Sequence, residues 1–281
     1  MTIARLTVAE AARRRILWVL VALTLLSVAL TGWGVERLAD LARARGADEL
    51  SIRFGVSQVL ILVAFMFSFV VAMTAAFLGA SAIAADVESG VALAMLARPI
   101  RRADLVLGRW LGLAVIVAGY AIGSGLLEIA VVGLLTGHAP PEPFVAVGFL
   151  AFESIVVLTV ALLLGTRLPA IAGAAIAVVL FGLGWMAGVF AGVARLFGVE
   201  SLAGLASATR WLLPTDGLWR GVVYGLEPPE LLLGAIAVGR AAQANPFYAM
   251  APPPMPFVAW SVVWVAVVVG LAVWSLDRRE L

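Results

Sequence analysis

Long apolar segments alternate with short polar segments along the whole chain. An α-helix of about 20 apolar residues crosses the ~30 Å hydrocarbon core of a bilayer, and six segments reach that length. The pattern therefore predicts six membrane-spanning helices. They are expected at about residues 16–35, 54–85, 105–136, 144–166, 170–194 and 256–276.

The polar connections carry further expectations. Residues 36–53 are rich in charges of both signs and are expected to form a loop, while residues 86–104 form a polar connection between the second and third spans. Residues 167–169 make a very tight return, because Pro169 cannot continue a helix. Residues 195–255 are interpreted as an irregular outer region of short interfacial or re-entrant helices, with two further spans as the alternative.

The composition agrees with this pattern. Hydrophobic residues make up 63% of the 281 residues and charged residues 13%, whereas soluble domains are about 45–50% apolar and about 25% charged. Too little polar surface remains to cover a soluble domain of this length. We expect an all-α polytopic membrane protein in which residues 1–281 form a single transmembrane domain.

The charges are distributed unequally between the two sides of the predicted bundle. All 19 basic residues are arginine. The side with both termini carries eleven arginines against six acids, and the other side carries eight against nine. Because the arginine-rich ends of spans face the cytoplasm, we place both termini in the cytoplasm of a multi-pass protein of the cell inner membrane. The excess of arginine is thereby assigned to topology, and no nucleic-acid partner is expected.

Three residue types exclude several kinds of chemistry. A P-loop requires a lysine on the phosphates, and the chain contains no lysine, so ATP and Mg²⁺ must be bound by a partner subunit. The absence of cysteine excludes disulfides and thiolate metal ligands. His138, the one histidine, is expected to be a loop residue. We therefore expect no catalytic residue, no metal site and no cofactor in this chain.

The connection at residues 86–104 carries the most informative pattern. Apolar side chains recur there at helical spacing until a proline ends the pattern. This predicts a short amphipathic helix over residues 86–98. Two interpretations remain open: a helix that docks into a groove of another protein, and a topology-setting loop on anionic lipid headgroups. The apolar positions are Val87, Val91, Ala94 and Met95.

Residues 84–109 resemble a known membrane protein family. The segment is similar to the pattern of ABC-2 permeases of ABC transporters. It has, in order, an acidic residue, a glycine, a small apolar helix, the sequence Arg-Pro-Ile-Arg-Arg and a basic residue in the next span. The sequence departs from that pattern where Val91 replaces threonine, Arg101 a small hydroxyl residue and Arg109 lysine. The matching residues are Glu88, Gly90, Leu96, Pro99, Ile100, Arg102 and Arg109.

The resemblance implies a type V exporter-like permease fold of six helices. It also implies a dimer with a second copy or a related permease, and an ATP-binding cassette ATPase subunit docked on the cytoplasmic side. Within the class, the chain resembles single-permease systems such as the nitrous-oxide reductase maturation transporter. The implied ATPase-coupling residues are Asp86, Glu88, Gly90, Val91, Met95, Arg98, Pro99, Arg101 and Arg102.

Two acidic residues lie inside predicted spans, where a charge is costly. Glu128 is eight residues before the end of the third span, and Glu153 is nine residues after the start of the fourth. We expect both carboxylates at similar depth, where they share a proton or meet an arginine from the outer side. They are interpreted either as a polar patch in the translocation pathway or as a paired structural group.

The N-terminus offers a second candidate contact. Residues 7–10 read Thr-Val-Ala-Glu, a capping-box pattern that predicts a helix beginning near Thr7. Such a helix would run along the membrane interface into residues 13–15, which are three arginines. The alternative is that these arginines serve only as a topology signal.

Two functions from different classes follow from the sequence. The first is a permease subunit that forms a dimeric export pathway driven by separate ATPase subunits. The second is a non-transporting assembly or scaffold protein that holds partners, such as an outer-side accessory protein, through residues 195–255. An intramembrane enzyme is not favoured, because no nucleophile or metal set accompanies Glu128 and Glu153. The lipid bilayer is the remaining expected partner.

Overall fold

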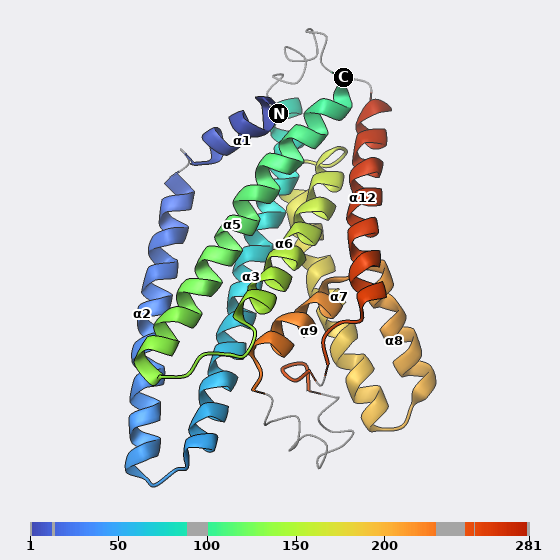
Figure 1. The fold of residues 1–281 in the computed structure, drawn as a ribbon. Helices are drawn as coiled ribbons and strands as arrows, with labels where there is room; N and C mark the ends of the chain where they lie inside the picture. Colours follow the sequence, from blue (N-terminus) through green and yellow to red (C-terminus); the bar gives the residue numbers. More distant parts are fainter. Residues whose placement is uncertain (1, 13–14, 89–100, 229–244, 250, 280–281) are drawn as a thin grey trace.

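The computed structural model describes residues 2–12, 15–88, 101–228, 245–249 and 251–279. Every regular element in these ranges is an α-helix. The helices pack side by side in one bundle that carries both chain termini at the same end (Figure 1). We call this end the terminal end. The helices are α1 (Thr2–Ala12), α2 (Arg15–Ala44), α3 (Glu49–Glu88), α5 (Arg102–Thr136), α6 (Pro143–Gly165), α7 (Ala170–Leu196), α8 (Glu200–Leu212), α9 (Thr215–Leu226) and α12 (Met255–Asp277).

Six helices within the described ranges are long and apolar enough to cross a bilayer. The prediction of an all-α, multi-pass membrane protein with six spans is thereby confirmed. The α3 helix has 40 residues and is therefore about 60 Å long, roughly twice the thickness of the hydrocarbon core. The six segments are Trp18–Ala44, Glu49–Asp86, Arg102–Thr136, Pro143–Gly165, Ala170–Leu196 and Met255–Asp277.

The prediction of a charged loop over residues 36–53 is wrong for most of its length. The α2 helix continues to Ala44 and α3 begins at Glu49, so residues 45–48 alone connect them. The helices continue because apolar side chains remain on the faces that they present to each other. This buried set, which includes one residue of α5, is Val35, Ala39, Ile52, Val56, Leu60 and Val132.

The connection between α2 and α3 is closed by a turn and a helix cap. Gly46 adopts a φ of 79°, which a residue with a side chain rarely takes. Asp48 then accepts hydrogen bonds from the backbone N–H of Ser51 at 3.3 Å and from its Oγ at 2.5 Å. These hydrogen bonds hold the pKa of Asp48 below its ordinary value.

The α6 helix lies at the centre of the bundle. It contacts α3, α5, α7, α9 and α12, and side chains such as Leu158 are fully buried. Its closest approach to α3 requires glycine, because a Cβ atom on Gly165 would clash with the carbonyl oxygen of Ala80. The α2 helix is peripheral by comparison, and many of its apolar side chains, such as Leu30, are exposed.

Between α7 and α12 the chain forms a helical hairpin, α8–α9, that inserts among the spans. The two helices have 13 and 12 residues, which is too short to cross a bilayer. The tip of the hairpin packs against Gly184, well inside α7. Its other end returns to the turn before α6, where the N–H of Glu142 donates to the carbonyl oxygen of Gly225 at 3.1 Å.

The α8–α9 hairpin therefore enters and leaves at one end of the bundle, opposite the terminal end (Figure 1). It occupies residues 200–226 of the region 195–255 that was expected to be irregular. Residues 229–244 of that region lie outside the described residues.

Candidate functional site

An ion pair joins α3 to α5 at the terminal end. Arg109 Nη2 lies 2.7 Å from Asp86 Oδ2. The side chains are only 14% and 16% exposed, so the pair is shielded from water and stronger than an ordinary surface pair. It stands where α3 leads into residues 89–100, and it therefore fixes the two helices that flank this segment.

Arg102, in the first turn of α5, binds the carboxyl end of α12. Its Nη1 donates to the carbonyl oxygens of Leu276 at 2.7 Å, Asp277 at 2.9 Å and Arg279 at 2.9 Å. The last carbonyl groups of a helix have no partner within the helix and carry a partial negative charge. The guanidinium of Arg102 donates hydrogen bonds to these carbonyl groups and places a positive charge beside their partial negative charge. It thereby joins the start of α5 to the end of α12.

A second set of hydrogen bonds ties the turn between α6 and α7 to the same end of α12. Arg167 donates from Nε to Ser275 Oγ at 3.0 Å and from Nη2 to the Ser275 carbonyl oxygen at 2.8 Å. Arg279 Nη1 donates in the opposite direction, to the carbonyl oxygen of Thr166 at 2.5 Å. We call the bonds of Arg102, Arg167 and Arg279 to these carbonyl groups the arginine clasp.

The N-terminal helix α1 packs into a groove on α5. A Cβ atom on Gly108 would lie 2.6 Å from Ile3 Cβ, and one on Gly112 would lie 2.7 Å from Thr7 Cβ. These two glycines form a G-x-x-x-G pair, which allows close helix approach. Thr7 lies inside α1, where its Oγ1 donates to the carbonyl oxygen of Ile3 at 2.9 Å. The prediction that the helix begins near Thr7 is therefore wrong.

The predicted coupling residues are distributed around this end of the bundle. Asp86 and Arg102 make the contacts described above, and Arg101 is exposed immediately before α5. Because α3 extends through Glu88, the first residues of the predicted amphipathic helix 86–98 continue α3. The remaining coupling residues, Gly90, Val91, Met95, Arg98 and Pro99, lie outside the described residues.

Glu153, one of the two predicted intramembrane acids, is buried on α6 between other helices. It is 2% exposed, and its Oε2 accepts a hydrogen bond of 2.9 Å from Ser68 Oγ on α3. A buried polar group that has a hydrogen-bond partner costs far less than an unpaired one. Glu153 therefore connects α6 to α3.

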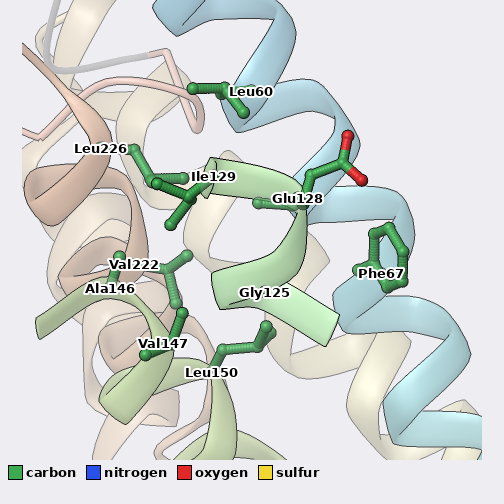
Figure 2. Close-up of a pocket in the computed structure, with 11 residues that line it drawn as sticks. Leu60, Phe67, Gly125, Glu128, Ile129, Ala146, Val147, Leu150, Val222 and Leu226 are labelled. Atoms are coloured by element: carbon green, nitrogen blue, oxygen red, sulfur yellow. The ribbon is translucent and has the colours of Figure 1, made fainter. Parts of the chain in front are cut away.

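Glu128 on α5 is also buried, at 4% exposure, but its surroundings differ. A neutral hydroxyl, that of Thr31 on α2, interacts with it, yet neither carboxylate oxygen has a hydrogen-bond partner of acceptable geometry. The residue lines a small cavity of about 20 Å³, roughly the space of one water, with apolar neighbours from α3, α5, α6 and α9. Figure 2 shows the carboxylate pointing toward α3, between Leu60 and Phe67.

The two acids lie at similar depth but are not paired. Glu153 binds Ser68, and Glu128 lies beside the preceding residue, Phe67, in the cavity. Among the residues that the structure describes, no hydrogen bond joins the two carboxyl groups and no arginine forms an ion pair with either. The expectation that they share a proton or meet an outer arginine is therefore not met.

A comparison with known protein families identifies the class of the chain. The family model described as "ABC-2 family transporter protein" matches residues 1–281. The chain belongs to the ABC-2 transporter family. It is a permease component of an ABC transporter, a membrane subunit of a kind that is typically not itself an enzyme. No curated protein matches the chain closely enough to be reported as a relative.

This ABC-2 permease contains a buried charge cluster that the sequence did not suggest. Asp216, at the tip of the α8–α9 hairpin, is 2% exposed and forms ion pairs with Arg210 and, at 3.6 Å, with Arg220. The Asp216 carboxylate occupies the space that a side chain on Gly188 would fill. The Leu-Leu-Pro-Thr-Asp segment was the available signal, because proline and aspartate together favour a tight helix start.

His138 of this permease lies in the turn between α5 and α6. Its side chain is 11% exposed, and Nε2 lies 3.8 Å from Glu49 Oε1 at the start of α3. The described residues contain no group of three or more His, Cys, Asp or Glu side chains that could hold a metal ion.

Proposed function

We propose that this chain is the transmembrane subunit of an ATP-driven exporter whose ATPase subunits dock on its terminal end. The observation that supports this most directly is the arginine clasp. It joins the start of α5, the turn between α6 and α7 and the carboxyl end of α12 into one unit. A force applied to residues 86–104 would therefore move several spans together.

The contacts at the two ends of the coupling segment support a route for that force. On one side, Asp86 at the end of α3 is paired with Arg109 of α5. On the other side, Arg102 joins the first turn of α5 to α12 by hydrogen bonds, so a displacement of that turn would also move α12. In this proposal Glu88, Gly90, Val91, Met95, Arg98, Pro99 and Arg101 contact the ATPase, whereas Asp86 and Arg102 transmit the movement to the spans.

The energy source follows from composition. The chain has no lysine, and a P-loop needs one to hold the phosphates. ATP and Mg²⁺ would accordingly bind to the partner subunit. The active assembly would hold two permeases, either two copies of this chain or one copy and a related permease. The terminal end would lie on the cytoplasmic side of the inner membrane.

Glu128 rather than Glu153 is the candidate for the translocation pathway. Glu153 is satisfied by Ser68 and holds two helices together. Glu128 lines a cavity and lacks a hydrogen bond of normal geometry. The resemblance to nitrous-oxide reductase maturation permeases stays a prediction about cargo, which the genes adjacent to this one would test.

Co-purification with the ATPase encoded next to the gene tests the proposed docking face. The double variant Glu88→Arg with Arg101→Glu reverses two charges there and should abolish co-purification. The matched control is Arg45→Glu, because Arg45 is exposed in the α2–α3 connection at the opposite end. Unchanged binding of the ATPase to the double variant would contradict the docking face. A complex with an outer-side protein and no ATPase would favour the scaffold function instead.

A further inference from the structure

A pocket lies between the first turns of α3 and the turn that joins α5 to α6, toward the end of the bundle opposite the terminal end (Figure 1). Its volume is about 220 Å³, many times the ~10–15 Å³ that one water molecule needs. The cavity beside Glu128, by comparison, measures about 20 Å³. The pocket therefore has room for a small ligand.

The α3 wall of the pocket carries two hydrogen-bond donors on one face of the helix. Arg53 and Ser57 both line the pocket, and residues four positions apart lie on the same side of a helix. Arg53 is exposed, and within the described residues it forms no ion pair. Ser57 is only 6% exposed, and its hydroxyl forms no hydrogen bond in the described part of the chain. Both side chains are therefore free to donate into the pocket.

The turn between α5 and α6 forms the other wall. The imidazole of His138 lies there, and its Nε2 has no hydrogen-bond partner of normal geometry. Pro140 and Pro141 line the pocket as well, and each proline ring fixes its own φ angle. The wall is therefore stiff, so a ligand would not lose affinity by ordering the turn around it.

The lining of the pocket is positively charged. Arg53 supplies the fixed charge. Three acids are neighbours of the lining residues, namely Glu49, Glu142 and Glu227, but none of them lines the pocket. Of these, Glu49 is 56% exposed and lies beside His138, with Oε1 3.8 Å from Nε2. A pocket that combines a cation with hydrogen-bond donors favours an anion over a cation.

We propose that this pocket binds a small oxyanion, that is, a carboxylate or a phosphate group. The guanidinium of Arg53 presents a planar fork of donors that fits two oxygens of such a group. The hydroxyl of Ser57 donates to the same group from one helical turn away. The site goes beyond the proposed export function, and it does not depend on the docking of an ATPase at residues 86–104.

A cysteine in the wall of the pocket tests the proposal. The chain has no native cysteine, and Ala139 is an exposed lining residue that donates nothing to the ligand from its side chain. Methyl methanethiosulfonate, an uncharged thiol reagent, modifies Ala139→Cys more slowly when the pocket is occupied. In maltoside detergent, inorganic phosphate at ten times its half-protecting concentration should slow the reaction about tenfold, because few sites remain free. Chloride at equal ionic strength should have no such effect.

Three variants in the Ala139→Cys background assign the effect to the proposed residues. Arg53→Gln should abolish protection by phosphate. Arg45→Gln, which changes another exposed arginine toward the same end of the bundle, is the matched control and should retain it. Ser57→Ala removes a donor to a charged group, so half-protection should need at least about tenfold more phosphate. Protection that survives Arg53→Gln, or that is lost equally in Arg45→Gln, would overturn the proposal.

The same cysteine distinguishes a soluble anion from a lipid headgroup. In nanodiscs of phosphatidylglycerol and buffer without phosphate, the lipid alone presents the phosphate group. Slower modification there with Arg53 than with Arg53→Gln would support the site and assign it to the headgroup. Protection neither by soluble phosphate nor by this lipid would overturn the proposal. Because neither arm contains an ATPase or measures transport, such a failure would leave the proposed function untouched.

Discussion

The arginine clasp and the α8–α9 hairpin use arginine in opposite ways. At the terminal end, the arginine clasp directs guanidinium groups to backbone carbonyls of α12 and of the α6–α7 turn. Inside the bundle, near the tip of the α8–α9 hairpin, two arginines converge on one carboxylate, that of Asp216. Carbonyl dipoles bind the cation without neutralising it, whereas the Asp216 carboxylate neutralises one of the two arginine charges.

The difference predicts how the stability of each region responds to the substitution of one residue. The clasp distributes its bonds over three arginines and several carbonyl groups, so it can lose one bond and keep the others. The hairpin depends on a single buried acid. The terminal end also keeps its positive charge, which suits an anionic surface such as lipid headgroups or an acidic docking site.

The largest expected effect is at the hairpin. Asp216→Asn leaves the largely buried Arg210 and Arg220 side chains, each 19% exposed, without a counter-charge, so the protein should lose about 3–5 kcal/mol of stability. Heating followed by size-exclusion chromatography measures the loss. Glu200→Gln, an exposed acid in the first turn of α8, is the control and should change little. Similar effects of the two variants would mean that Asp216 does not hold the hairpin.

The clasp should be less sensitive. Arg102→Gln removes a charged donor from the end of α12 and should cost about 1.5–3 kcal/mol, the worth of a hydrogen bond to a charged group. The neighbouring Arg101→Gln, which changes an exposed side chain, should be close to neutral in stability. If Arg102→Gln destabilised the protein as much as Asp216→Asn, the clasp would depend on a single residue just as the hairpin does, and the contrast between the two regions would be wrong.

A smaller effect is expected where α1 packs on α5. Gly112→Ala places a Cβ atom against Thr7 and the Ala4 carbonyl oxygen, and overpacking of this kind costs about 1–3 kcal/mol. Gly119→Ala on the same helix meets nothing within 4 Å and should stabilise slightly, because alanine favours helix more than glycine does. Thermal unfolding of the two variants gives the comparison. Equal shifts would indicate that α1 is not seated in the groove.

The last effect concerns pH at the end of α9. Burial raises the pKa of Glu227 to about 7 from an ordinary 4.5, so the folded protein holds this proton more tightly than the unfolded chain does. The stabilisation is complete below pH 4.5 and is lost as the pH rises through about 7. Glu227→Gln should flatten the fall in melting temperature between pH 5 and pH 8. An unchanged slope would show that another group causes the pH dependence.

The spans could be predicted from the sequence because the length of an apolar helix is fixed by the bilayer. The end of α2 and the start of α3 could not be predicted in this way. Charged residues such as Glu36 and Arg53 make this stretch look like a loop, although the buried faces of the two helices pack against each other. The burial of Asp216 could not be predicted for the same reason. Its local sequence is typical of an exposed loop acid, and its burial depends on the packing of the hairpin beside α7.

The candidate site was only partly accessible to the same reasoning. Arg102 and Asp86 were singled out by a resemblance of pattern, but their partners on α12 and α5 lie far away in sequence. Glu128 and Glu153 were expected inside spans, because both are acids in apolar segments, and the structure places both inside spanning helices, where they are buried. Their different surroundings depend on Ser68 and Phe67 of α3, which no local pattern connects to either acid.

Cross-linking from single cysteines tests the central claim, that an ATPase docks on the terminal end through residues 86–104. The chain has no native cysteine, so a photoreactive thiol reagent on Val91→Cys or on Ala47→Cys reports one position at a time. Our account predicts a covalent product with the co-expressed ATPase from position 91 and none from position 47, which lies in the α2–α3 connection at the opposite end. A product from position 47, or none from position 91, would contradict it.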